Sequence, residues 1–185
     1  MKIVKFLSYI ITLFSLYLFI VFNNAQRQLS QVPIFNTISG IKEEHLGNKD
    51  SAIAFYNKAI ELEPNNFAHY VNRGMFFAEN GDPKRAFDDY NKAIKLNPKN
   101  PITYDNRGFL KSQMGDNKGA ISDYSQAIAV DPNFIASYIS RYKLYVSMGD
   151  KKKAIGDLHK IADIYKSNGQ EAEYQQVIQE INTYE

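Results

Sequence analysis

Three short stretches with a common spacing decide the fold of this chain. The first is Tyr70–Gly74, "YVNRG", which returns at Tyr104–Gly108 as "YDNRG" and, after the same interval again, at Tyr138–Tyr142 as the altered copy "YISRY". Self-similarity at a fixed period of about 34 residues is typical of repeat proteins, in which each unit packs only against its neighbours. The spacing therefore predicts a stack of similar units.

Many other positions follow the same interval, and most of them are small, aromatic or proline residues. They are Gly40, Gly74 and Gly108; Ala52, Ala86, Ala120 and Ala154; Ala59, Ala93 and Ala127; Tyr56, Tyr90 and Tyr124; and Pro64, Pro98 and Pro132. Small residues let two helices approach closely, and we expect Gly74 and Ala86 to lie on facing sides of the two helices of one unit. The aromatic residues should fill the space around such contacts.

Each unit is predicted to be a pair of antiparallel helices. In the second copy, Phe67–Asn80 is an amphipathic stretch that ends at Gly81 and Asp82, and Pro83 then stands where a helix can begin without its N–H. The next helix runs as far as Leu96, because Pro98 prevents its continuation. Glycine suits the positive φ of a helix C-cap, and Asp or Asn suits the following N-cap.

Charged residues also follow the repeat. Three arginines are each followed by an aspartate at one fixed spacing, in the pairs Arg73 and Asp89, Arg107 and Asp123, and Arg141 and Asp157, whereas the first copy has Ser39 and Phe55 at these positions. Because the two residues are present or absent together, we predict a ladder in which each arginine binds an aspartate of its own or the preceding unit. The alternative is three independent solvated charges.

The N-terminus is hydrophobic. Phe6–Phe22 is a run without a charge, and Lys2 and Lys5 precede it. As a helix of ~1.5 Å per residue it would nearly cross the ~30 Å hydrocarbon core of a bilayer. We expect residues 1–25 to form an uncleaved signal-anchor with a cytoplasmic N-terminus, which places the repeats on the outer or periplasmic side. The alternative is a signal peptide whose cleavage leaves a secreted or periplasmic protein. Residues 26–32 are polar and are predicted to be a linker.

The composition argues against several classes of function. Without Lys2 and Lys5 the chain carries 20 basic and 20 acidic residues, so it lacks the basic excess of a nucleic-acid-binding protein. It has no cysteine, and His45, His69 and His159 stand in separate repeats without a metal-ligand spacing. No catalytic or phosphate-binding motif is present. We therefore expect no enzyme activity, metal, cofactor or small-molecule substrate.

The recurring residues resemble the signature of the tetratricopeptide repeat (TPR) family. The second copy matches it at Tyr70, Gly74, Phe77, Ala86, Tyr90, Ala93 and Pro98. The third copy matches with Lys111 in place of an aromatic residue, and the last copy departs at Tyr142, Ile161 and Lys166. The resemblance implies an all-α, right-handed α-solenoid of four units, at 33–66, 67–100, 101–134 and 135–166. An apolar stripe in 169–185 predicts a capping helix.

The resemblance also implies a binding groove. In TPR proteins the first helix of each unit lines the concave face, and some members use an asparagine there to bind the backbone of an extended peptide. An amide side chain donates and accepts hydrogen bonds, so it can pair with any peptide unit. The predicted groove residues are Val71, Asn72, Met75, Glu79, Asp105, Asn106, Phe109, Gln113, Ile139 and Lys143. The alternative is that Asn72 and Asn106 are ordinary surface polar residues.

Two functions follow as expectations. The first is a non-catalytic TPR adaptor that is tethered to a membrane and binds an extended segment of a partner protein. The second is a structural subunit that assembles with itself as a homo-oligomer, or with an envelope complex, without a peptide-binding groove.

Overall fold

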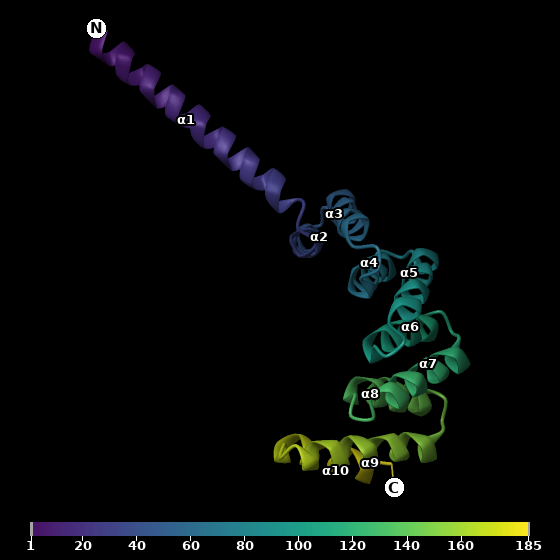
Figure 1. Cartoon of the computed structure of the whole chain (residues 1–185). Helices are drawn as coiled ribbons and strands as arrows, with labels where there is room; N and C mark the ends of the chain where they lie inside the picture. Colours follow the sequence, from purple (N-terminus) through teal and green to yellow (C-terminus); the bar gives the residue numbers. More distant parts are fainter. Residues whose placement is uncertain (1, 185) are drawn as a thin grey trace. The chain divides into compact units, whose positions relative to one another are not determined.

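The computed structural model describes the backbone of residues 2–184 and the side chains of residues 15–184. The described chain is all α-helix, as predicted, with ten helices joined by short turns (Figure 1). They are α1 (Lys2–Leu29), α2 (Pro33–His45), α3 (Lys49–Leu62), α4 (Phe67–Glu79), α5 (Pro83–Leu96), α6 (Pro101–Gln113), α7 (Asn117–Val130), α8 (Ile135–Ser147), α9 (Lys151–Ser167) and α10 (Glu171–Asn182).

The chain forms two compact units, residues 1–69 and residues 70–185. In the first unit, α2 packs against α3. In the second unit, α6 packs against α7 and α8 against α9, and α7 also contacts α8. Helices α2 to α9 therefore form the helix-turn-helix pairs that the sequence predicts.

The turns inside the pairs have the predicted chemistry. Gly81 adopts φ +76°, which closes α4, and the Asp82 carboxylate accepts a hydrogen bond from the backbone N–H of Arg85 at 3.0 Å. Pro83 is the first residue of α5. A left-handed glycine and a capping aspartate recur at Gly115 with Asp116 and at Gly149 with Asp150.

The recurring spacing between glycine and tyrosine has a steric cause. A Cβ atom added to Gly74 would lie 2.7 Å from Cε1 of Tyr90, closer than real Cβ contacts come. Gly40 with Tyr56 and Gly108 with Tyr124 repeat the arrangement. Ala86 is fully buried, as expected, but the nearest atoms to Gly74 belong to the tyrosine ring. Each glycine thus makes room for the tyrosine on the second helix of its own pair.

In the last pair, the larger of the two side chains is on the first helix and not on the second. Tyr142 occupies the glycine position and Leu158 the tyrosine position, and both are buried. The Tyr142 hydroxyl donates a hydrogen bond to the Glu180 carboxylate on α10 at 3.0 Å. Val177 and Ile181 of α10 join the same core cluster. Helix α10 therefore buries an apolar stripe against the last pair, and its Glu180 also contacts that pair through Tyr142.

The arginine ladder is confirmed in the second unit. Arg107 donates to the Asp123 carboxylate through Nε at 2.9 Å and Nη2 at 2.6 Å, and its Nη1 donates to Oδ1 of Asn91 at 2.7 Å. Asn91 lies on α5 of the preceding pair, so one guanidinium joins two repeats. Arg73 binds Asp89 with the same two-bond geometry, and Arg141 binds Asp157 and also Ser125.

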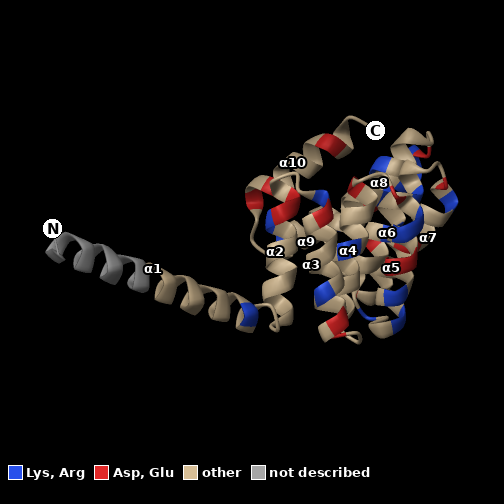
Figure 2. Ribbon diagram, turned by 90° about the horizontal axis from the view of Figure 1, so that it is seen from above, with Lys and Arg blue, Asp and Glu red and all other residues tan. Residues whose placement is uncertain are grey.

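The N-terminal segment differs from one expectation. Residues 26–32, predicted as a linker, are helical as far as Leu29. The break falls between Ser30 and Val32 because the residue before a proline avoids the helical region, and Pro33 begins α2. Among residues 15–29 of α1, whose side chains are described, Arg27 is the only charged residue. Figure 2 accordingly shows the coloured part of α1 in tan except near its C-terminal end.

The predicted membrane anchor, residues 1–25, contains the apolar run 6–22, and residues 6–14 of this run fall outside the described side chains. Among the described residues, no helix has the length and apolar character needed to cross a membrane.

Candidate functional site

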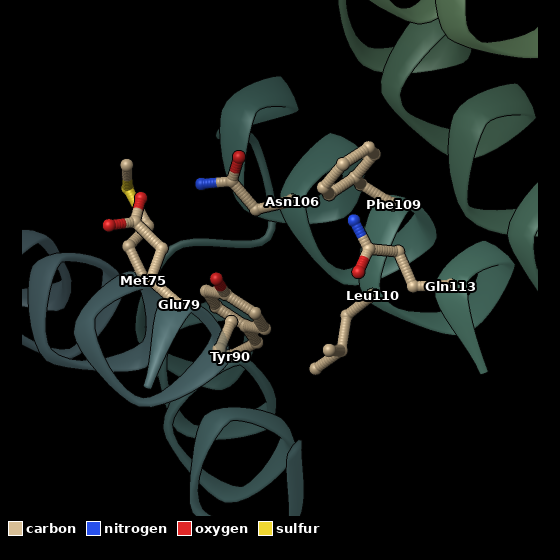
Figure 3. A pocket seen from close by; sticks show the side chains of 8 residues that line it. Met75, Glu79, Tyr90, Asn106, Phe109, Leu110 and Gln113 are labelled. Atoms are coloured by element: carbon tan, nitrogen blue, oxygen red, sulfur yellow. The ribbon is translucent and has the colours of Figure 1, made fainter. Parts of the chain in front are cut away.

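Two cavities lie along the first helices of the pairs in the second unit. The Asn106 pocket has a volume of about 330 Å³, and its lining comes from α4, α5 and α6: Met75, Ala78, Glu79, Tyr90, Asn106, Phe109, Leu110 and Gln113 (Figure 3). The Ser140 pocket has a volume of about 300 Å³, and its lining comes from α6, α7 and α8: Phe109, Ser112, Tyr124, Ile139, Ser140, Lys143, Leu144 and Ser147.

The two pockets are copies of each other. Seven of the eight residues that line the Asn106 pocket have their counterpart, one repeat further along the chain, in the lining of the Ser140 pocket. Tyr90 corresponds to Tyr124, Leu110 to Leu144 and Asn106 to Ser140. Phe109 belongs to both linings, so the pockets adjoin. A ligand that runs across the first helices would therefore meet two equivalent sites in succession.

The Asn106 pocket contains a buried hydrogen-bond donor without a partner. Nδ2 of Asn106 is shielded from solvent and donates to no atom of the described residues. Figure 3 shows this nitrogen directed toward α4, from which Met75 and Glu79 project. A buried polar group that loses its hydrogen bond costs about 1–3 kcal/mol. The equivalent residue of the next pocket is Ser140, which carries no amide group.

The tyrosines of the pockets remain neutral hydrogen-bonding groups at physiological pH. The pKa of Tyr124 is raised to about 12, chiefly by burial and then by the negative charge of the nearby Asp105. The pKa of Tyr90 is also raised, chiefly by burial and then by the charges of Glu79 and Asp89. Neither phenol is poised for acid or base catalysis.

Apolar side chains are exposed around the pockets. Met75 is 40% exposed and Phe109 is 55% exposed, although both are large hydrophobic residues on helices that are otherwise packed. Exposed apolar groups that gather beside a cavity are typical of surfaces that bind another protein. The arrangement can hold an apolar side chain and offer a hydrogen bond beside it.

The structure brings most of the predicted groove residues together. Met75, Glu79, Asn106, Phe109 and Gln113 line the Asn106 pocket, and Ile139 and Lys143 join Phe109 in the Ser140 pocket. The tyrosines and leucines of the linings were not predicted as groove residues. Their positions in the repeat could have identified them. The tyrosine follows the glycine position at a fixed spacing, and the leucine lies two residues after the glycine position.

Three predicted groove residues line neither pocket: Val71, Asn72 and Asp105. Val71 is buried, with 6% of its surface exposed, and Asn72 is half-buried. Asp105 accepts a hydrogen bond from the Ser137 hydroxyl at 2.6 Å, and burial raises the pKa of its carboxyl group. Asp105 therefore ties α6 to α8.

The described residues hold no cluster of histidine, cysteine or carboxylate side chains that could bind a metal ion. His69 is buried, and its two ring nitrogens form hydrogen bonds with Thr37 Oγ1 and Glu63 Oε2, each at 2.9 Å. This histidine is used for structure.

Family models of the tetratricopeptide repeat match three segments, residues 68–100 with one model and residues 37–66 and 102–134 with another, which together cover just over half of the chain. Among solved structures, the MamA protein is 24% identical, with a TM-score of 0.61, over 82% of this chain and 87% of that chain.

Two further structures have the same fold. PilF of Pseudomonas aeruginosa is 15% identical, with a TM-score of 0.64, over 85% of this chain and 78% of that chain. The first TPR domain of Spaghetti (RPAP3), solved with the HSP90 peptide SRMEEVD, is 24% identical, with a TM-score of 0.58, over 65% of this chain and 95% of that chain. At these identities the likeness shows the fold alone.

Proposed function

The chain belongs to the tetratricopeptide repeat family of protein-interaction modules, and from this premise we propose that it is a membrane-tethered adaptor that binds an extended segment of a partner protein. The segment would lie across the Asn106 and Ser140 pockets. The chain itself would contribute binding and no chemistry, since proteins of this scaffold family are typically non-catalytic.

The observation that carries this proposal is the unpaired amide of Asn106. A buried donor without a partner destabilises the free protein, so its presence in a cavity favours a ligand that supplies the acceptor. A main-chain carbonyl is such an acceptor in every peptide, whatever its side chains. The neighbouring Met75 and Phe109 would then bury an apolar part of the segment.

The structural comparison supports the mode of binding. The Spaghetti TPR domain was solved with a bound peptide, and it shares the fold of this chain. TPR domains bind peptide segments of protein partners, and a continuous row of equivalent pockets suits an extended chain.

The tether is supported by the sequence. The uncharged run Phe6–Phe22 is longer than the core of about 7–15 residues in a signal peptide, which favours an uncleaved anchor. Lys2 and Lys5 precede the run and only Arg27 follows it closely, which favours a cytoplasmic N-terminus. The repeats would then lie on the outer or periplasmic side. Added protease should digest the repeats in sealed spheroplasts with this topology. Full protection until the membrane is opened would contradict it.

Crosslinking tests the binding site. A photoreactive residue at Phe109 of the full chain in its native membrane should capture one discrete partner protein, and Asn106→Leu should reduce the yield severalfold. The matched control is the same photoreactive residue at Gln126, an exposed position of α7 outside both pockets. The proposed groove would be refuted by equal capture from positions 109 and 126. It would also be refuted if Asn106→Leu left the capture from position 109 unchanged.

One observation favours self-assembly as a second function. Ile34, Ile38 and Ile41 of α2 are all exposed, and their spacing places them on one face of the helix. If this face joins two copies, Ile38→Glu should lower the mass of the detergent-solubilised full chain in light scattering. Crosslinking from Phe109 should remain. A mass that is already monomeric in the wild type would exclude this function.

A further inference from the structure

The two pockets carry opposite charges. Glu79 lines the Asn106 pocket and Lys143 lines the Ser140 pocket, and both side chains are exposed. No ion pair found among the described residues includes either of them. Other charged residues of this region are paired; Lys111, for example, binds Asp123 at 2.8 Å. The charges of the pocket linings are thus available to a ligand.

The charge of Glu79 acts inside its pocket. After burial, Glu79 is the larger of the two charged contributors that raise the pKa of the Tyr90 phenol, and Tyr90 lines the same cavity. Figure 3 shows the Glu79 side chain beside Met75, across the cavity from Asn106. A cationic group in this pocket would therefore meet both a carboxylate and an apolar wall.

Helix packing sets the spacing between the pockets. Packed helices lie about 8–10 Å apart, and the linings of the two pockets differ by one repeat, so we expect corresponding points of the pockets to lie at a similar distance. Glu79 on α4 and Lys143 on α8 lie on opposite sides of α6, so the ligand side chains that reach them extend away from each other. A polyproline II segment advances about 3.1 Å per residue with three residues per turn, which places side chains i and i+3 on the same side about 9 Å apart. A β-strand would point these two side chains to opposite faces. The spacing of the pockets thus suits a polyproline II conformation.

We propose, as a refinement that rests on the function proposed above, that the groove selects a segment carrying a lysine or arginine and an acidic residue three positions apart. The cationic side chain enters the Asn106 pocket beside Glu79, and the carboxylate enters the Ser140 pocket beside Lys143. A main-chain carbonyl between them accepts the hydrogen bond from Nδ2 of Asn106. The groove therefore has a charge polarity, which fixes the direction in which such a segment lies.

Peptide selection tests the charge polarity. The full chain in non-ionic detergent at low ionic strength should enrich, from a random heptapeptide library with blocked ends, peptides with a cation and a carboxylate three positions apart in one order. The double variant Glu79→Lys with Lys143→Glu should enrich the opposite order. For a purified peptide, reversing both of its charges should weaken binding to the wild type about three- to tenfold, because each exposed pair contributes modestly.

A matched control exchanges charges outside the pockets. Asp88 on α5 and Lys118 on α7 line neither cavity. The double variant Asp88→Lys with Lys118→Glu should therefore enrich the same peptides as the wild type. If this control also inverts the order of the two charges in the selected peptides, the selection depends on the net charge of the surface, and the proposed polarity is wrong.

The outcomes separate the refinement from the function on which it rests. Suppose that the selected peptides no longer bind Asn106→Leu, but that they lack the charge pair or show the same order of charges with the Glu79→Lys, Lys143→Glu variant. This result would overturn the charge polarity and leave the proposed groove intact. Selection of no peptide that depends on Asn106 would overturn the proposed peptide-binding function, and the polarity with it.

Discussion

Replacing Gly74 by alanine tests the reason for the repeat itself. Alanine in place of glycine favours a helix by about 0.8–1.0 kcal/mol when nothing obstructs the new methyl group. Here the methyl group would lie 2.7 Å and 2.9 Å from two ring carbons of Tyr90, which is 2% exposed and cannot move into solvent. Overpacking of this kind costs about 1–3 kcal/mol. We therefore expect Gly74→Ala to be neutral or destabilising.

The matched control is Gly156→Ala. Gly156 lies in the middle of α9, and a Cβ added there meets no atom within 4 Å, so this variant should show the helical gain alone. In thermal melts followed by circular dichroism, about 2–4 °C of Tm corresponds to 1 kcal/mol in a chain of 150–250 residues. The Tm of Gly74→Ala should thus fall below that of Gly156→Ala by about 2–12 °C.

A second substitution makes the test more specific. Tyr90→Leu copies the last repeat, which has Leu158 at the tyrosine position, and it should reduce the cost of Gly74→Ala in a double-mutant cycle. If Gly74→Ala raises Tm as much as Gly156→Ala does, the steric pairing of glycine with tyrosine is wrong.

Two further predictions concern partly buried charged residues of the second unit. Arg107→Lys should cost about 1–3 kcal/mol, because an ammonium group cannot replace both bonds to Asp123 and the bond to Asn91; urea unfolding should show this loss, and Arg85→Lys at an exposed pair should change stability by less than about 1 kcal/mol. Burial raises the pKa of Asp105, so the folded state binds its proton more tightly than the unfolded state, and stability from this group falls as pH rises from the ordinary pKa of 3.8 through the raised pKa. Asp105→Asn should therefore raise Tm relative to the wild type at pH 7, with a smaller difference at pH 4, and an equal difference at both pH values would contradict the origin of the effect.

Much of the fold follows from local signals in the sequence. Gly81, Asp82 and Pro83 end one helix and begin the next through backbone chemistry that acts within a few residues. The arginine ladder is also predictable, because the arginine and aspartate positions of Arg107 and Asp123 are both occupied in three copies and both changed in the first copy. Both kinds of signal repeat in the sequence, and repetition distinguishes them from chance.

The contacts that differ from repeat to repeat could not be predicted in the same way. Tyr142 stands at a position where the other copies have glycine, and the sequence alone does not explain the change. The structure shows that the Tyr142 hydroxyl binds Glu180 of α10. Asp105 occupies a groove-facing position in the pattern, yet Ser137 on the neighbouring helix binds it. These outcomes depend on side-chain packing between units, which a register alone does not specify.

The pockets were predicted in part. The sequence indicated Asn106 and Phe109 as groove residues, and the structure places both in the Asn106 pocket. The sequence does not indicate that Nδ2 of Asn106 lacks a hydrogen-bond acceptor, because hydrogen bonding depends on distances of a few ångströms between helices. That unsatisfied donor distinguishes this pocket from its copy, in which Ser140 stands in place of the asparagine.

The most direct test of the account measures stability and binding together in Asn106→Leu. If the amide is kept for a ligand, its replacement by an apolar side chain of similar size should raise the Tm of the free full chain, because about 1–3 kcal/mol of unmet hydrogen bonding is removed. The same variant should bind the peptide selected by the wild type at least tenfold more weakly. A lower Tm together with unchanged peptide affinity would contradict the account.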